Sequence, residues 1–246
     1  MEVAKSFVEN YLPSEVLKII DINTLKPQKD SFINKDLEEV FSDMLFQVNM
    51  NGEIGYLYFL FEHKSYVSPN VAFQLLRYMI EIWDAKIKNE NQEKLPMIIP
   101  LVIYHGKEKW KVKTSLGQMV NGYNDLPNEV RKYIPNYEYL IYDLSHYTDD
   151  EIKGVIRLKI VLRILKDIYT APKEKIFENI HRALIALNKI ENQQEGIECF
   201  ETYIRYIINA SKTLAKEDIE KVIEEVTENY SEGSEVIMTI AKIWEA

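Results

Sequence analysis

The feature that most constrains the fold is a pair of apolar runs joined by the dipeptide Asn51-Gly52. The runs, 44–50 and 54–61, are rich in the aliphatic and aromatic residues that favour strands. Asn-Gly between two such runs is the strongest short-range hairpin signal, because both residues tolerate the positive φ angles of a tight turn. The sequence therefore predicts a β-hairpin, and the rest of the fold must accommodate its two antiparallel strands.

The register of this hairpin decides where the polar residues at its open end lie. If the loop centres on Gly52 and Glu53, opposed residues have numbers that sum to about 105, and side chains alternate between faces with period two. Asp43 then lies opposite Glu62, and Lys64 projects from the same face. Four further residues of the two strands share that face, namely Leu45, Gln47, Tyr58 and Leu60. The three charged side chains are expected to converge at one end of the hairpin.

Two carboxylates brought together repel each other, and a divalent cation commonly relieves that repulsion. Mg²⁺ is held by one or two carboxylates together with water and phosphate oxygens, so Asp43 and Glu62 form a candidate magnesium site. Lys64 is placed to stabilise charge on a phosphate or to help activate a water molecule. The alternative is structural: Asp43 caps a strand, and residues 62–64 are a polar strand end.

A helix is predicted directly after the hairpin. Ser68 and Pro69 have the form of a helix start, and the segment 71–88 has helical apolar spacing. Its apolar stripe consists of Val71, Leu75, Tyr78, Met79 and Ile82. Gln74 and Tyr78 lie one turn apart on one side of this stripe.

Strands are predicted on either side of the following loop. The segment 97–104 is almost entirely apolar, as expected for a strand covered on both faces, and 137–144 alternates like a further strand. The order strand, helix, strand predicts a right-handed crossover to a parallel neighbour. Ahead of the hairpin, 7–20 reads as a helix interrupted at Pro13, and 25–33 reads as an irregular polar link.

Taken in order, these segments resemble the PD-(D/E)XK nuclease superfamily: a hairpin with an acid, an E-x-K pair, a helix with Q-x-x-x-Y as in RecB-type members, and a buried strand. Residues 2–150 are similar more closely to the recombination-promoting nuclease (Rpn) family, also called YhgA-like putative transposases. The segments that carry this resemblance are YLP, FSDMLFQV, FLFEHKS, FQLLRYMIEIW, IIPLVIYHG and YLIYDLSHY. Each motif alone is weak, whereas their order is specific.

The resemblance implies an α/β fold, with a PD-(D/E)XK restriction-endonuclease-like core in which helices flank a mixed central β-sheet. It also implies roles for the hairpin residues. Asp43 matches the first metal-binding acid, although Ser42 stands where the superfamily motif has proline. Glu62 and Lys64 match the E-x-K pair, and the carbonyl of His63 is a further candidate metal ligand.

On the helix, the resemblance implies that Gln74 positions the reacting water or the phosphate and that Tyr78 accompanies it. The implied activity is that of a DNA endonuclease, dependent on Mg²⁺ or Mn²⁺, which hydrolyses phosphodiester bonds in recombination or mobile elements. Members of the family carry an HD-x-x-F-K segment ahead of the point where this chain begins with Met1. The alternative is therefore a catalytically inactive protein of the same family that binds nucleic acid or a partner.

Composition bounds the class of protein. With 46% hydrophobic and 28% charged residues, the chain has the composition of an ordinary soluble domain. It has no apolar run of membrane-spanning length and no signal peptide, so a cytoplasmic location without a membrane is expected. A single cysteine, Cys199, and four scattered histidines make a cysteine cluster or a zinc site improbable.

The overall charge argues against a broad attraction to nucleic acid, because the formal net charge is −9 and the pI is about 5.1. Contact with DNA must then be local. The candidate segment carries alternating lysines, Lys107, Lys109, Lys111 and Lys113. On a strand they would form one basic face, and the alternative is an edge strand that its lysines protect against aggregation.

After Asp150 the composition turns helical. Five helical segments are predicted, at 151–169, 172–187, 196–211, 216–230 and 234–244. We therefore predict two domains, a nuclease-like core over 1–150 and a helical C-terminal extension over 151–246. The extension is the expected site of contact with a second copy of the chain or with a regulatory partner.

Overall fold

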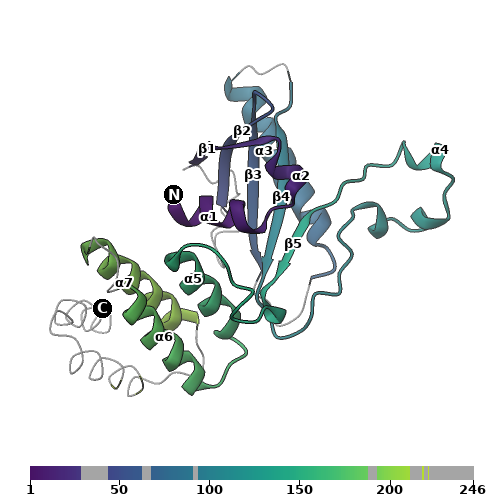
Figure 1. Ribbon diagram of the computed structural model, residues 1–246. Coiled ribbons are helices and arrows are strands. Elements are labelled where there is room, and N and C mark those ends of the chain that lie inside the picture. Colours follow the sequence, from purple (N-terminus) through teal and green to yellow (C-terminus); the bar gives the residue numbers. More distant parts are fainter. Residues whose placement is uncertain are drawn as a thin grey trace. The chain divides into compact units, whose positions relative to one another are not determined.

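The computed structural model describes residues 1–28, 44–62, 68–90, 94–187 and 193–210, together with Asp218 and Lys221 (Figure 1). The chain divides into two compact units, Met1–His146 and Tyr147–Ala246. The boundary predicted after Asp150 lies close to this division, while the roles assigned to the two domains stay a prediction.

The first unit is built on a five-stranded sheet in the order β1-β2-β3-β4-β5. Its strands are β1 (Ile20–Pro27), β2 (Met44–Met50), β3 (Glu53–Glu62), β4 (Met97–Tyr104) and β5 (Leu140–Asp143). β2 pairs with β1 and β3 in the antiparallel sense, whereas β4 pairs with β3 and β5 in the parallel sense. The predicted mixed sheet is therefore confirmed, as are the strands predicted within 97–104 and 137–144.

The turn of the hairpin consists of Asn51 and Gly52, with φ angles of 51° and 86°. Positive φ at both residues is the requirement of the two-residue turn that Asn-Gly favours. The predicted register was wrong by two residues, since Leu45 lies opposite Tyr58 rather than Leu60. The turn begins one residue earlier than assumed. Because the error is an even number, each side chain still lies on its predicted face.

The N-terminal helices cover one face of the sheet. α1 (Glu2–Tyr11) and α2 (Ser14–Leu17) are separated at Pro13, as predicted, although α1 begins earlier than expected. The ring of Phe7 on α1 meets Phe59 at 5.5 Å and Tyr142 at 5.2 Å between centroids, both in edge-on contact.

The opposite face is covered by α3 (Val71–Glu90) (Figure 1). The whole predicted stripe is buried, namely Val71, Leu75, Tyr78, Met79 and Ile82. The ring of Tyr78 lies 5.4 Å from that of Tyr58, which precedes Phe59 and so points to the other side of β3. α3 begins two residues later than predicted, because the carbonyl of Asn70 accepts the first helical hydrogen bond, from the amide of Gln74 at 2.9 Å.

Two stretches differ from the predictions. The polar link predicted from residue 25 is part of β1 as far as Pro27, the amide of Gln28 still donates to the carbonyl of Leu45 at 2.9 Å, and residues 29–33 lie outside the described residues. Between β4 and β5 the chain forms short helical turns, η2 (Gly117–Met119), η3 (Tyr123–Asp125) and α4 (Asn128–Arg131), and η4 (Leu144–His146) follows β5.

The second unit contains α5 (Ile156–Asp167), α6 (Lys173–Leu187) and α7 (Gln193–Ala210). Their apolar faces share one core, which includes Ile160, Ile164, Ile176, Ile180, Phe200, Ile204 and Ile207. Three of the five predicted helices are thus confirmed, the first in part, since residues 151–155 are not helical. The other two lie outside the described residues except for Asp218 and Lys221. Every helix in the described part of the chain is too short or too polar to span a membrane.

Candidate active site

Of the three predicted metal ligands, Asp43, Glu62 and His63, the structure describes Glu62. It is the last residue of β3, and its side chain is 4% exposed. Asp43, His63 and Lys64 lie outside the described residues. Their convergence with Glu62 therefore stays a prediction.

Three side chains meet at the carboxyl ends of the parallel strands. Tyr104, the last residue of β4, pairs with Glu62 on one side and with Asp143, the last residue of β5, on the other. The backbone amide of His105 donates to the carbonyl of Glu62 at 3.2 Å, which extends this pairing. Paired residues of neighbouring strands point to the same face, so these three side chains share one face of the sheet. The carboxyl ends of parallel strands are where open α/β sheets bind their ligands.

α3 covers this same face. Glu62, Leu60 and Tyr58 are two residues apart along β3 and so point to the same face. The ring of Tyr58 contacts that of Tyr78 on α3. The side-chain amide of Gln74 donates to the hydroxyl oxygen of Tyr78 at 3.2 Å. Tyr78 is buried and Gln74 is half-buried, as expected for a tyrosine that supports the glutamine from behind. The side chain of Glu62 and the pair Gln74 and Tyr78 of α3 thus lie on the same side of the sheet.

The hydroxyl of Tyr104 is buried, and among the described residues it has no hydrogen-bond partner. Burial raises its pKa, and the negative charges of Asp143, Glu108 and Glu62 raise it further, while the backbone amide of Glu108 partly offsets the rise. The phenol therefore stays protonated at physiological pH. A neutral donor thus lies between two strands that each end in a carboxylate.

Asp143 was not identified from the sequence. Its Oδ2 accepts a hydrogen bond from the backbone amide of Trp110 at 2.9 Å. Its Oδ1 accepts from the amide of Ser145 at 3.1 Å and from the Ser145 hydroxyl at 2.5 Å. An Asp side chain that accepts from the backbone amide two residues later forms an Asx-turn. The Asp-x-Ser pattern at Asp143 is a signal from which its role could have been predicted. Each carboxylate oxygen accepts a hydrogen bond from a backbone amide, so Asp143 holds the segments that contain Trp110 and Ser145 next to the end of β5.

The basic segment does not form the predicted strand. Residues 105–113 are irregular, and the amide of Trp110 is bound by the side chain of Asp143 rather than by a neighbouring strand. Strand pairing would require a backbone acceptor at that position. The predicted alternation survives in exposure, because Trp110 and Val112 are half-buried whereas all four lysines, Lys107, Lys109, Lys111 and Lys113, are exposed.

Aromatic contacts fix this segment beside the carboxyl ends of the strands. The ring of Trp110 lies 5.0 Å from that of Tyr104 and 6.4 Å from that of Tyr139. The hydroxyl of Tyr139 donates to the carbonyl of Lys113 at 3.2 Å, and burial raises the pKa of this phenol to about 12, so it remains a donor. The lysines that flank Trp110 are therefore held at the same edge of the sheet as Glu62.

A neighbouring tyrosine connects the same region to α3. The hydroxyl of Tyr137 donates to the carbonyl of Ala72 in the first turn of α3, and burial raises the pKa of Tyr137. The segment ahead of β5 thus packs against the helix that carries Gln74.

The described residues do not form a complete metal site, since they contain no group of three or more His, Cys, Asp or Glu side chains arranged to hold an ion. Glu62 does offer the hard carboxylate oxygens that Mg²⁺ prefers. Its predicted co-ligands, Asp43 and His63, are adjacent in sequence to described strands but are not themselves described.

Comparison with known proteins gives a consistent result. The family model described as "Putative transposase, YhgA-like" matches residues 1–195. The inactive recombination-promoting nuclease-like protein RpnE of Escherichia coli K12 is 26% identical over 242 residues, which cover 98% of this chain and 76% of that protein. Recombination-promoting nuclease RpnD of E. coli O157:H7 is 26% identical over 244 residues, covering 98% and 88%. Recombination-promoting nuclease RpnA of E. coli K12 is 29% identical over 241 residues, covering 98% and 78%.

No solved structure matches the chain. The family match nevertheless includes the hairpin, α3 and all three parallel strands, so it covers every element of the candidate site. It also agrees with the family that the order of the motifs indicated. The chain therefore belongs to the YhgA-like putative transposase family, and its curated relatives are recombination-promoting nuclease proteins.

Proposed function

We propose that this chain is a metal-dependent DNA endonuclease with a PD-(D/E)XK core. Two of its relatives, RpnD and RpnA, are named recombination-promoting nucleases. The observation that carries the proposal is the position of Glu62, a buried carboxylate at the carboxyl end of β3. It lies on the sheet face that α3 covers with the pair Gln74 and Tyr78.

Asp43 and Glu62 would hold Mg²⁺ or Mn²⁺ through their carboxylates, with the carbonyl of His63 as a further ligand. All three offer hard oxygen atoms, which suit these ions. Glu62 is buried at the end of β3, where exclusion of water would strengthen its attraction to a bound cation. When bound, the ion would neutralise charge on the phosphate and lower the pKa of a water molecule.

The other side chains around this site would orient the attacking water and stabilise charge on the phosphate. Gln74 donates a hydrogen bond from its amide nitrogen to Tyr78, which leaves its carbonyl oxygen to accept a hydrogen bond from the attacking water and orient it. Tyr78 is a positioning residue, because it acts through Gln74. Lys64 would stabilise the charge that develops on the phosphate.

The basic segment would bind the DNA backbone next to the reacting bond. Its lysines, Lys107, Lys109, Lys111 and Lys113, are exposed, and Trp110 anchors the segment beside Tyr104 at the carboxyl ends of the strands. Contacts of this kind position a duplex without reading its sequence. A local basic segment also reconciles DNA binding with the net charge of −9.

The second candidate function is binding of nucleic acid, or of a partner chain, without cleavage. It is favoured by one comparison, since RpnE is named as inactive and is 26% identical to this chain over 242 residues. The anchored lysine segment would serve such a protein equally well, because phosphate binding does not require Glu62.

Incubation of the purified protein with supercoiled plasmid tests the proposal. We expect nicking or cutting with Mg²⁺ or Mn²⁺ and none with excess EDTA. Glu62→Gln should lose activity, whereas Glu53→Gln, an exposed residue at the other end of the same strand, should keep it. Cleavage by Glu62→Gln at the parental rate would reject the site. A protein that binds the plasmid but never cuts it would support the second candidate.

A further inference from the structure

A cavity of about 100 Å³ lies in the second unit between α5 and α6. Its lining combines four apolar residues, Ile156, Ile160, Ala183 and Ala186, with Asn179 and three charged residues, Lys159, Arg163 and Arg182. All three charges are positive. In a chain with a net charge of −9, a cavity with only cationic charged residues in its wall is unexpected from composition.

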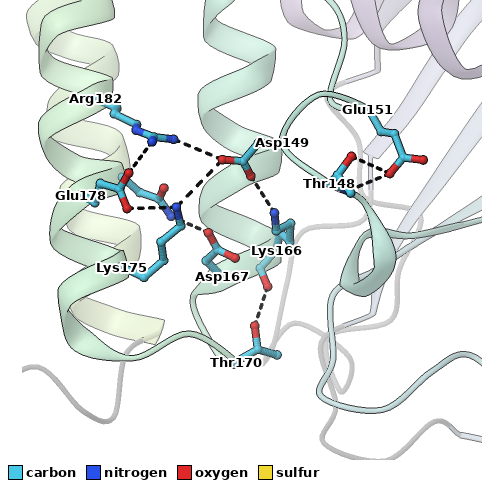
Figure 2. A network of polar contacts seen from close by, with 10 residues as sticks. Thr148, Asp149, Glu151, Lys166, Asp167, Thr170, Lys175, Glu178 and Arg182 are labelled. Atoms are coloured by element: carbon cyan, nitrogen blue, oxygen red, sulfur yellow. Dashed lines mark hydrogen bonds and ion pairs between the residues drawn. The ribbon is translucent and has the colours of Figure 1, made fainter.

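Of the acids near this cavity, Asp149 and Glu178 pair with cations, whereas the buried Asp167 accepts a hydrogen bond from the wall residue Asn179. Figure 2 shows Asp149 at the centre of a network, with Lys166 at 2.7 Å, Arg182 at 3.2 Å and Lys175 at 4.0 Å. The ion pair with Lys166 is the main cause of the lowered pKa of Asp149. The other guanidinium nitrogen of Arg182 pairs with Glu178. Asp149 thus pairs with three cations, and Arg163 lies close enough to lower its pKa further without forming an ion pair with it.

Lys159 and Arg163 have no acidic partner within 4 Å among the described residues. They lie one turn apart on α5, both half-buried, and the Nε of Arg163 is buried without a hydrogen-bond acceptor. Like charges at this spacing destabilise a helix, and burial of an unpaired charge is unfavourable. The pair therefore weakens α5 unless an anion occupies the cavity.

Asn179 adds an unsatisfied acceptor to the same wall. It is 6% exposed, and its amide nitrogen donates to Asp167 at 2.7 Å. Its carbonyl oxygen is buried without a donor. A buried polar atom without a partner is uncommon in a native protein, so a ligand with a hydroxyl or NH donor beside its negative charge fits the cavity better than a bare anion does.

We propose that this cavity binds a phosphate monoester group. Lys159 and Arg163, which form no ion pair within 4 Å among the described residues, match a group that carries up to two negative charges better than a carboxylate with one charge, and guanidinium groups bind phosphate through paired hydrogen bonds. The volume is room for several water molecules, hence for a group of that size. The apolar wall would contact the carbon that bears the ester oxygen.

The phosphate could be carried by a free nucleotide or by the terminal phosphate of a nucleic-acid strand, since both offer the same chemistry. The inference concerns the second unit alone and is independent of the nuclease activity proposed for the first. It can therefore be tested by binding, without measuring cleavage.

The experiment uses the full chain in metal-free, phosphate-free buffer at constant ionic strength. Calorimetric titrations compare inorganic phosphate, adenosine monophosphate, and one short oligonucleotide with a 5′-phosphate or a 5′-hydroxyl. In the double variant Lys159→Gln/Arg163→Gln, affinity for the phosphate monoesters should fall about tenfold or more. Lys153→Gln, which removes an exposed charge of the same unit outside the cavity, should change it by less than about twofold.

Thermal unfolding separates loss of a binding site from loss of the fold. In phosphate-free buffer the double variant should melt no lower than the parent, because the repulsion between two like charges is relieved. Phosphate should raise the melting temperature of the parent only. Preferential binding of the nucleotide would identify a free ligand, and preferential binding of the 5′-phosphorylated strand would identify a nucleic-acid end. Equal affinity of parent and double variant, or equal binding of the two oligonucleotides with no binding of the nucleotide, would overturn the proposal.

Discussion

Glu62 and Tyr104 are paired at the carboxyl ends of two parallel strands, and the amide that follows Tyr104 donates to the carbonyl of Glu62 at 3.2 Å. The backbone of Glu62 is therefore fixed by β4 as well as by its own strand. Sites supported by strands hold their geometry better than sites on loops. The candidate carboxylate is thus presented by a strand that pairs with β4 up to its last residue, next to a phenol that burial and neighbouring charges keep protonated.

The two buried tyrosines near this edge should respond differently to loss of their hydroxyl groups. The hydroxyl of Tyr104 has no hydrogen-bond partner in the described part of the chain, whereas that of Tyr139 donates to the carbonyl of Lys113. Tyr104→Phe should therefore leave the free energy of unfolding unchanged or raise it, while Tyr139→Phe should lower it by about 1 kcal/mol. Urea unfolding followed by circular dichroism measures both. A larger loss in Tyr104→Phe would show that its hydroxyl makes a stabilising contact.

The lysines on either side of Trp110 should govern the affinity for DNA. In Lys109→Glu/Lys111→Glu, binding to a short duplex should weaken and the slope of log K against log salt should fall by about 2, since each phosphate contact releases about 0.9 counterion. Fluorescence anisotropy at several salt concentrations measures both quantities. The control is Lys18→Glu/Lys132→Glu, which makes the same charge change at exposed positions elsewhere in the first unit. Identical salt slopes in the two variants would remove this segment from the DNA interface.

Asp143 should be needed to hold that segment in place. Asp143→Ala removes the acceptor for the amide of Trp110 and for both donors of Ser145. We expect a loss of about 1 to 3 kcal/mol in unfolding free energy, together with weaker DNA binding. The matched control is Asp125→Ala, at an exposed position on η3. If Asp143→Ala kept both the stability and the DNA affinity of the parent, the lysines would not depend on this anchor.

The features predicted correctly are those that short stretches of sequence determine. The turn at Asn51-Gly52 depends on the φ angles of two residues, and the buried stripe of α3 depends on helical spacing within one segment. The register error came from placing the turn one residue too late. Such an error is invisible in the alternation of faces, because period two is unchanged by an even shift.

The features that were missed depend on residues far apart in the chain. β1 mixes the apolar Ile20, Ile22 and Leu25 with polar residues and ends at Pro27, and pairing with β2 makes it a strand. Residues 107–113 have the alternation of a strand, but Asp143 takes the amide of Trp110. Neither relation is visible before the order of strands in the sheet is known. The convergence of Asp43, His63 and Lys64 stays a prediction, because these residues lie outside the described part of the chain.

The hairpin turn offers a graded test of its backbone geometry. Gly52 has a φ of 86°, and a Cβ added there would have no atom within 4 Å, so a substitution is limited by conformation rather than by space. Gly52→Ala should lower the unfolding free energy by about 1 kcal/mol or more, and Gly52→Asn should lower it less, because Asn adopts positive φ more readily. Thermal or urea unfolding measures the series. Equal stability of the Ala and Asn variants would contradict a turn with positive φ at this position.

The last prediction concerns the pH dependence of the second unit. The pKa of Asp149 is lowered in the folded state, mainly by its hydrogen bond with Lys166, so its stabilising effect is present above the ordinary carboxylate pKa of about 4 and is lost as the pH falls through the folded value. Asp149→Asn should therefore unfold more easily than the parent at pH 7, and the difference should begin to shrink below pH ~4, where the unfolded parent takes up a proton, and vanish below the lowered folded pKa. The control is Asp150→Asn, which removes the adjacent exposed carboxylate. Urea unfolding between pH 3 and 7, on the scale of these pKa values, measures the difference. A gap between Asp149→Asn and the parent that stays constant over this range would mean that the ion pairs around Asp149 do not stabilise the fold.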